Sequence, residues 1–218
     1  MERTRAERGG GDRWRSLAGV VAIVGSLVWM ATPWVQTAVL GDRPYVASVF
    51  DVTSFGGWAL MLVGLVGYHS AFRDEHGRVG RIGVGLTGIG MVLVALLELR
   101  SVAAFVGAGF RAVPATGDDP AGLVVTLGFV LGLGCTVVGA GVIGVALRRA
   151  GNATMTGALL LLSAPAVPLV LVVLRFLTVL PLPVGRLVVN TNAALLPLGI
   201  GWLALGRLVW MHSRRAGG

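Results

Sequence analysis

Six long apolar stretches run through the chain, separated by short segments rich in charged residues, glycine and proline. A helix needs about 20 apolar residues to cross a hydrocarbon core of about 30 Å, and each stretch reaches that length. The predicted spans cover residues 17–40, 52–72, 81–106, 123–147, 155–180 and 187–211. The pattern therefore predicts a chain that crosses a bilayer six times.

The same pattern distinguishes helices from strands. Barrel strands alternate apolar and polar residues over about 10 positions, whereas these stretches are apolar on all sides. Only helices and closed barrels satisfy their backbone polar groups within lipid. We expect an all-α fold, a helical transmembrane bundle.

Polar segments flank the bundle at both ends. Residues 1–16 are glycine-rich and carry five arginines against three acids, which predicts a disordered basic cytoplasmic tail, and residues 212–218 form a second cytoplasmic tail. The stretch from Leu17 to Leu40 exceeds the apolar region of a signal peptide and lacks a clear cleavage site. It is expected to be an uncleaved anchor.

Composition agrees with a lipid environment. Hydrophobic residues make up 55% of the chain and charged residues 13%, against about 25% charged in soluble domains. All 18 basic residues are arginine, a usage typical of GC-rich bacterial genomes. We therefore expect the cytoplasmic (inner) membrane of a bacterium, with the lipid bilayer as the first partner and a membrane-protein partner or a second copy as a further one.

The arginines indicate the orientation. The amino tail, the segments after the second and fourth spans and the carboxyl end hold 13 of the 18, whereas the opposite loops hold Arg43, Arg111 and Arg186. The positive-inside rule then places both termini in the cytoplasm. The formal charge of +8 is thus explained by topology, and because the arginines lie scattered in short loops we expect no nucleic-acid partner.

Polar residues inside or beside the spans are the best candidates for function, because ionisable groups at membrane depth are rare and usually face the bundle interior. Six are predicted to meet near the outer interface: Asp51, Glu98, Arg100, Arg175, Asn190 and Asn192. Glu98 and Arg100 point to different sides of their helix, so the expected pairs are Glu98 with Arg175 and Arg100 with Asp51. Structural ion pairs that fix helix register are the favoured interpretation, ahead of a substrate, proton or ion site and of a partner contact.

Other features carry less chemistry. His69, His76, Asp74 and Glu75 lack the spacing of metal ligands, and Cys135 has no thiol partner, so we expect no metal, cofactor or catalytic residue. Pro165 and Pro168 predict a kink in the fifth span, which lines a cavity in some transporters but more often only affects packing.

Small residues four positions apart predict close helix packing, as in the sets Gly128 with Gly132, Ala140 with Gly144, and Ala18 with Ala22 and Ser26.

The runs GGWALMLVGLVGYHSAF, GRVGRIGVGLTGIGMVLVALLELR and RRAGNATMTGALLLL resemble a loose group of small, uncharacterised bacterial six-span membrane proteins. The resemblance lies in the hydrophobic pattern and the glycine-rich helix starts, and it covers most of the chain. It implies a six-helix inner-membrane protein, and it supplies no catalytic residue.

Three classes of function follow. A membrane enzyme needs a nucleophile with a base, paired acids or metal ligands at depth, and only one carboxylate lies well inside a span, so we expect no enzyme. A non-catalytic structural, accessory or sensory protein needs none of these and is the favoured interpretation. The alternative is a small transporter or permease with a polar site near the outer leaflet around Glu98 and Arg175.

Overall fold

The computed structural model describes residues 2–40, 45–75, 77–114, 120–151, 155–164 and 196–216. Its helices are α1 (Glu2–Leu40), α2 (Val49–Phe72), α3 (Gly77–Gly107), α4 (Pro120–Ala150), the helical segment Met155–Ala164 and α7 (Leu196–Ala216). A short antiparallel pairing of β1 (Tyr45–Ala47) with β2 (Val113–Pro114) joins two loops. Apart from that pairing, the prediction of an all-α fold is confirmed.

Four of the described helices are long and apolar enough to cross a membrane: Arg13–Leu40, Val49–Phe72, Gly77–Gly107 and Leu127–Ala150. They coincide with the first four predicted spans. Of the fifth, the apolar segment Met155–Ala164 is described, and residues 165–180 lie outside the described part, Pro165 and Pro168 included. The sixth is described from Leu196 onward, as α7.

The amino-terminal segment differs from the prediction. Residues 1–16 were expected to form a disordered tail, whereas α1 begins at Glu2. Glutamate, arginine and alanine favour helices and no proline precedes Pro33, so nothing but glycine opposes continuation of the membrane helix toward the terminus.

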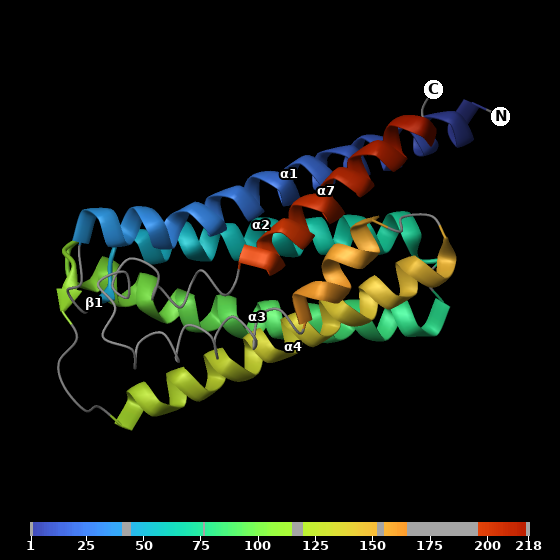
Figure 1. Cartoon of the computed structure of the whole chain (residues 1–218). Coiled ribbons are helices and arrows are strands. Elements are labelled where there is room, and N and C mark those ends of the chain that lie inside the picture. The colour runs from blue at the N-terminus through green and yellow to red at the C-terminus, as the bar shows by residue number, and fades with distance from the viewer. Residues whose placement is uncertain are drawn as a thin grey trace.

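Neighbouring helices run antiparallel (Figure 1). Gly25 of α1 faces Gly57 of α2, and Gly64, two turns further along α2, faces Ala22 and Ala18, earlier in α1. On the other side of α1, Gly19 faces Trp210 of α7. The amino-terminal end of α1 and the carboxyl-terminal end of α7 therefore lie at the same end of the bundle (Figure 1).

Small residues lie at these helix contacts, as expected from their spacing. Ala18, Ala22 and Ser26 are all buried, and a methyl group added at Gly144 would lie 2.6 Å from the carbonyl oxygen of Gly157. Without large side chains the backbones approach closely, and van der Waals packing then replaces the hydrophobic effect that is lost between helices in lipid. The predicted role of these residues in packing is confirmed.

The contact between α3 and α4 is built from a motif that occurs once on each helix. The motif consists of a glycine, a threonine, a second glycine and a β-branched residue, at the same spacing on both helices. Its members are Gly83, Thr87, Gly90 and Val94 on α3, and Gly132, Thr136, Gly139 and Ile143 on α4. The contacts are reciprocal: Gly83 faces Ile143 and Gly132 faces Val94, while each inner glycine faces the threonine of the other helix. The pair therefore packs as if related by a local two-fold axis.

Both threonine hydroxyls in this contact are buried and satisfied within their own helix. Thr87 Oγ1 donates to the carbonyl oxygen of Gly83 at 2.8 Å, and Thr136 Oγ1 donates to that of Gly132 at 2.9 Å. Such bonds to the preceding turn are the usual way for threonine to sit in an apolar helix. Neither hydroxyl proton of the motif is left to donate to another group.

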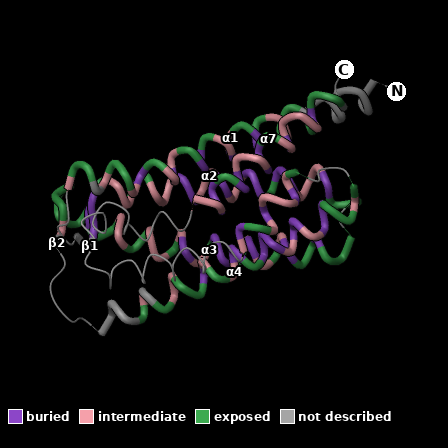
Figure 2. Tube along the Cα trace, viewed as in Figure 1, coloured by how far each residue is buried: buried purple, intermediate pink, exposed green. Residues whose placement is uncertain are grey.

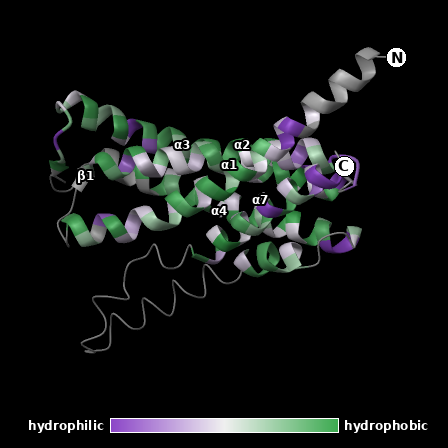
Figure 3. Ribbon diagram, turned by 90° about the horizontal axis from the view of Figure 1, so that it is seen from above, coloured by the Kyte–Doolittle hydropathy of each residue, from purple (hydrophilic) through white to green (hydrophobic). Residues whose placement is uncertain are grey.

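The outer surface is as apolar as the interior. Buried positions line the inside of the bundle (Figure 2), and Trp58, Trp202, Tyr68, Met61 and Met91 are the largest of them. Yet Ile82, Ile89 and Leu96 of α3 are 65%, 65% and 59% exposed. Hydrophilic residues concentrate toward the ends of the bundle (Figure 3). Helices that are apolar all round and exposed are typical of proteins surrounded by lipid.

Local signals end the long helices where the sequence predicts turns. Gly77, with φ 56°, lies in the left-handed region at the turn between α2 and α3. At the other end of α3, the amides of Phe110 and Gly109 donate to the carbonyls of Phe105 and Val106, which is the Schellman arrangement. The rings of Phe105 and Phe110 pack against each other at 5.8 Å, so the end of α3 is fixed about two turns beyond Glu98.

Candidate functional site

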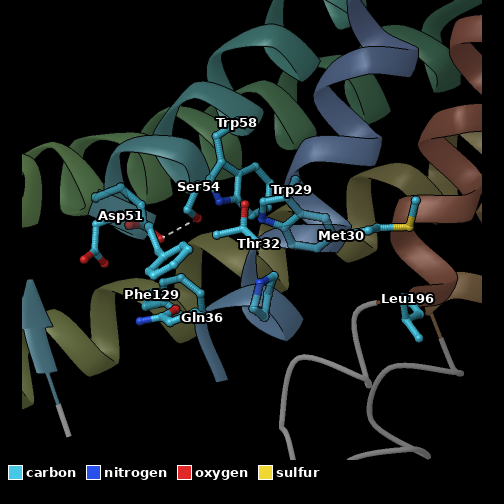
Figure 4. Close-up of a pocket in the computed structure, with 12 residues that line it drawn as sticks. Trp29, Met30, Thr32, Gln36, Asp51, Ser54, Trp58, Phe129 and Leu196 are labelled. Carbon is cyan, nitrogen blue, oxygen red and sulfur yellow. Dashed lines mark hydrogen bonds between the residues drawn. The ribbon is translucent and has the colours of Figure 1, made fainter. Parts of the chain in front are cut away.

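A cavity of about 110 Å³ lies in the half of the bundle opposite the termini, large enough for several water molecules. Four helices and the start of α7 contribute to its wall, and Figure 4 shows the side chains around it. The lining residues are Trp29, Met30, Thr32, Pro33 and Gln36 of α1, Phe50, Asp51, Ser54 and Trp58 of α2, Glu98 of α3, Phe129 of α4 and Leu196 of α7. Two carboxyl groups from different helices therefore share one cavity.

Asp51 is positioned by the start of α2. Ser48 caps the helix, its hydroxyl accepting a hydrogen bond from the amide of Phe50 at 3.2 Å. Asp51 Oδ2 in turn accepts from the Ser48 amide and from the Ser48 hydroxyl, which completes a capping box. Unpaired amides at a helix start favour a negative charge, so the same contacts that begin α2 hold the Asp51 carboxylate at the cavity.

Glu98 is held from the neighbouring helix. Ser54 Oγ of α2 donates to Glu98 Oε1 at 3.1 Å, the bond drawn as a dashed line in Figure 4. Glu98 is half-buried and lies nine residues before the end of α3, about 13 Å along the helix axis. Its second oxygen has no hydrogen bond to any described residue.

Hydroxyl groups join α1 to α2 beside the cavity. Thr32 Oγ1 and Thr53 Oγ1 lie 3.1 Å apart, and each also lies within hydrogen-bond distance of a carbonyl oxygen of its own helix, that of Val28 for Thr32 and that of Phe50 for Thr53. Because each hydroxyl has one proton, one threonine donates to the other and the accepting threonine donates to its own helix. Thr32 is buried at 8% exposure and is itself a lining residue. Together with Ser54 it adds neutral polar groups to the wall that carries the two carboxylates.

Aromatic rings form much of the remaining wall. Trp29 and Trp58 pack edge to face with centroids 4.9 Å apart and an interplanar angle of 65°. Trp58 is 1% exposed, and its indole Nε1 is buried without a hydrogen-bond partner among the described residues. Leaving a buried donor unpaired costs about 1–3 kcal/mol. An acceptor oxygen that came within hydrogen-bond distance of this nitrogen would recover that free energy.

The six residues of the predicted polar cluster fall into three groups. Asp51 and Glu98 line the same cavity. Arg100 is exposed, and the described contacts contain no ion pair between it and Asp51, whose carboxylate is engaged by Ser48. Arg175, Asn190 and Asn192 lie outside the described residues, and with them the expected pair of Glu98 and Arg175.

Sequence reasoning missed the neutral and aromatic members of the wall. Their spacing carried a signal, because Asp51, Ser54 and Trp58 are three and seven positions apart and share one face of α2. Trp29, Thr32 and Gln36 have the same spacing on α1. Two helices thus each present a face that mixes an aromatic ring with polar groups.

The remaining sequence candidates do not form a second site in the part of the chain that the structure describes. No group of three side chains that could hold a metal ion occurs there. Cys135 is a free, half-buried thiol on α4. His69 lies near the end of α2, and His76 falls outside the described residues.

No family model, curated protein or solved structure matches this chain, so its function has to be inferred from the cavity and its surroundings.

Proposed function

We propose that the chain is a multi-pass protein of the bacterial cytoplasmic membrane, with six spans and both termini in the cytoplasm. Four apolar helices of membrane-spanning length support the first part. The exposed arginines support the orientation, since Arg73, Arg78, Arg148 and Arg149 lie at the same end of the bundle as the termini. The resemblance to small six-span inner-membrane proteins implies the same arrangement.

Labelling tests this orientation. In a Cys135→Ser background, Asp74→Cys places a thiol in the turn between α2 and α3, and Arg111→Cys places one in the loop after α3; both positions are exposed. A membrane-impermeant maleimide applied to intact cells should label the cysteine at position 111, and the one at 74 only after permeabilisation. The reverse result would place the termini outside.

The function that the geometry supports best is binding of a small cation in the cavity, as in a small transporter or permease. One observation carries it: Asp51 and Glu98, on different helices, line a single cavity, and no cation among the described residues pairs with either of them. Their charges repel each other when both are ionised, and a cation between them removes that repulsion. Acids so placed within a bundle commonly mark ion or substrate paths.

A structural role is the second candidate, and it also has an observation in its favour. Asp51 caps α2 and Glu98 accepts a bond from Ser54, so each carboxyl group already contributes to helix position. In that case the chain is a non-catalytic scaffold, accessory or sensory protein. The two candidates differ in what happens when a cation is added.

Thermal unfolding of the purified full chain in a lipid nanodisc separates them. Chloride salts of sodium, potassium, ammonium and choline would be titrated at constant ionic strength, in the wild type and in Glu98→Gln. The glutamine keeps an oxygen to accept from Ser54 but removes the charge. Binding predicts that at least one cation raises the melting temperature of the wild type in a saturable way and fails to do so in the variant.

The matched control is Asp74→Asn, which removes a carboxylate that is exposed in the turn between α2 and α3 and lies outside the cavity. It should respond to cations like the wild type. If none of the four cations stabilises the wild type, the cation site is refuted and the scaffold interpretation stands.

A further inference from the structure

This inference rests on the proposed function and concerns the kind of cation that the cavity would take. We propose that the ligand is a small organic ammonium ion that carries an acceptor oxygen such as a hydroxyl group. Inorganic ions, neutral solutes and simple tetraalkylammonium ions would then bind more weakly at the same place.

Few carboxylate oxygens of the wall are free to bind a divalent metal ion. Calcium takes six to eight oxygen ligands and magnesium demands an octahedron. In this cavity one oxygen of Asp51 is held by Ser48 and one oxygen of Glu98 by Ser54. The two carboxyl groups can still balance one or two positive charges. An organic ammonium ion needs only this balance, because its nitrogen is already covalently bonded on all sides and requires no oxygen ligands.

The aromatic rings match such an ion. Trp29, Phe50, Trp58 and Phe129 all line the cavity, on three helices. Rings offer apolar contact and a negative face, and aromatic walls of this kind recognise alkylated ammonium groups. A strongly hydrated inorganic ion gains little from these rings, because contact with them would replace favourable contacts with water.

The rings are also fixed before a ligand arrives. Trp29 and Trp58 are 6% and 1% exposed and pack against each other edge to face. Thr32 and Thr53 join the same two helices beside them. A wall that needs no ordering loses less conformational entropy on binding.

The indole of Trp58 points to the second feature of the ligand. Trp58 lines the cavity, and its buried Nε1 has no hydrogen-bond partner among the described residues. The other polar groups that line the wall near it, Ser54 and Glu98, are already bonded to each other. An oxygen carried by the ligand would satisfy this donor, which a tetraalkylammonium ion cannot do.

Three probes test the inference on the full chain in nanodiscs, read by thermal unfolding and by tryptophan fluorescence, and each analogue differs from choline in one feature. Choline carries the charged trimethylammonium group and a hydroxyl, 3,3-dimethyl-1-butanol has the same shape without the charge, and ethyltrimethylammonium has the charge without the hydroxyl. Choline should give a saturable shift, at a concentration at least about tenfold lower than either analogue, the factor expected for one hydrogen bond or charge contact.

Glu98→Gln should weaken choline binding by about tenfold or more, whereas Asp74→Asn should leave it unchanged. If Glu98→Gln does not fold, the comparison of the three probes on the wild type still decides. Equal responses to choline and the neutral alcohol overturn the ammonium ion, and equal responses to choline and ethyltrimethylammonium overturn the oxygen contact.

The failure of this inference differs from the failure of the proposed function. A response to sodium or potassium but not to choline overturns the organic ligand and leaves a cation site in place. No response to any cation overturns both.

Discussion

Gly90 is the position at which a single methyl group should disturb the bundle most clearly. A Cβ atom added there would lie 2.6 Å from the backbone nitrogen of Thr136 and 2.5 Å from its hydroxyl oxygen, and it would also meet the carbonyl oxygen of Gly132. Two of these three atoms belong to the backbone of α4. They cannot turn aside as the end of a flexible side chain would, so Gly90→Ala must push α3 and α4 apart.

The size of the effect follows from these distances. Ordinary contacts begin at 3.4 Å, so the backbone nitrogen of Thr136 has to retreat by 0.8 Å, from 2.6 Å. Overpacking of this kind costs about 1–3 kcal/mol. Alanine also gains up to about 1 kcal/mol in helix propensity, which partly offsets the strain. The effect is therefore best measured against a glycine where only the propensity changes.

Gly85 provides that control on the same helix. It is exposed, and a Cβ added there meets nothing within 4 Å. Thermal unfolding in nanodiscs, followed by intrinsic tryptophan fluorescence, should place the melting temperature of Gly90→Ala roughly 2–10 °C below that of Gly85→Ala. If both variants melt together, the close contact of α3 and α4 through Gly90 is wrong, and so is the account of how these helices are held.

Two further predictions concern polar contacts. Asp51→Ala removes one half of the capping box at the start of α2 and should destabilise the protein by about 1 kcal/mol in equilibrium unfolding. Adding Ser48→Ala should cost little more, because the two residues act together, and additive losses in the double variant would count against the capping box. Thr136→Val keeps the shape of the buried side chain and removes only a hydrogen bond within the helix, so the same assay should show a loss of stability below about 1 kcal/mol. A larger loss of stability would mean that the hydroxyl has a partner on another helix.

The apolar pattern predicted the membrane helices well because length and hydropathy are properties of the sequence itself. The span expected at 52–72 is found as Val49–Phe72 and that at 81–106 as Gly77–Gly107. The extra residues include Asp51, Arg78 and glycines, at which the apolar pattern ends although the helix continues through them. The segment 1–16 differs for the same reason, since α1 extends beyond its apolar part.

The candidate site was predicted only in part. Asp51 and Glu98 stood out because charge is rare inside spans, and they do line one cavity. Their hydrogen-bond partners, Ser48 and Ser54, could not be deduced, because a serine in an apolar span is common and usually bonds to its own helix. The pair of Arg100 with Asp51 was expected from charge alone, yet the capping role of Asp51 satisfies the carboxylate locally.

The motif shared by α3 and α4 is inconspicuous in the sequence, because its two copies lie on the third and fourth spans and not on corresponding spans of the two halves of the chain. In a chain with 34 glycines the spacing alone also arises by chance. Only the reciprocal contacts, such as Gly90 on Thr136 and Gly139 on Thr87, give the spacing its meaning.

The same contacts explain why the cavity lies where it does. At Gly83, Gly90 and their partners the backbones of α3 and α4 touch, and no space is left between them. Toward the end opposite the termini the pattern changes: Gly128 of α4 meets not the backbone of α3 but the side chain of Leu97, at 3.2 Å. The residues that follow these two, Phe129 and Glu98, both line the cavity. The helices are thus held close where glycine faces backbone and spaced by a side chain where the polar groups lie, so a variant that weakens the glycine contacts should also change the shape of the site.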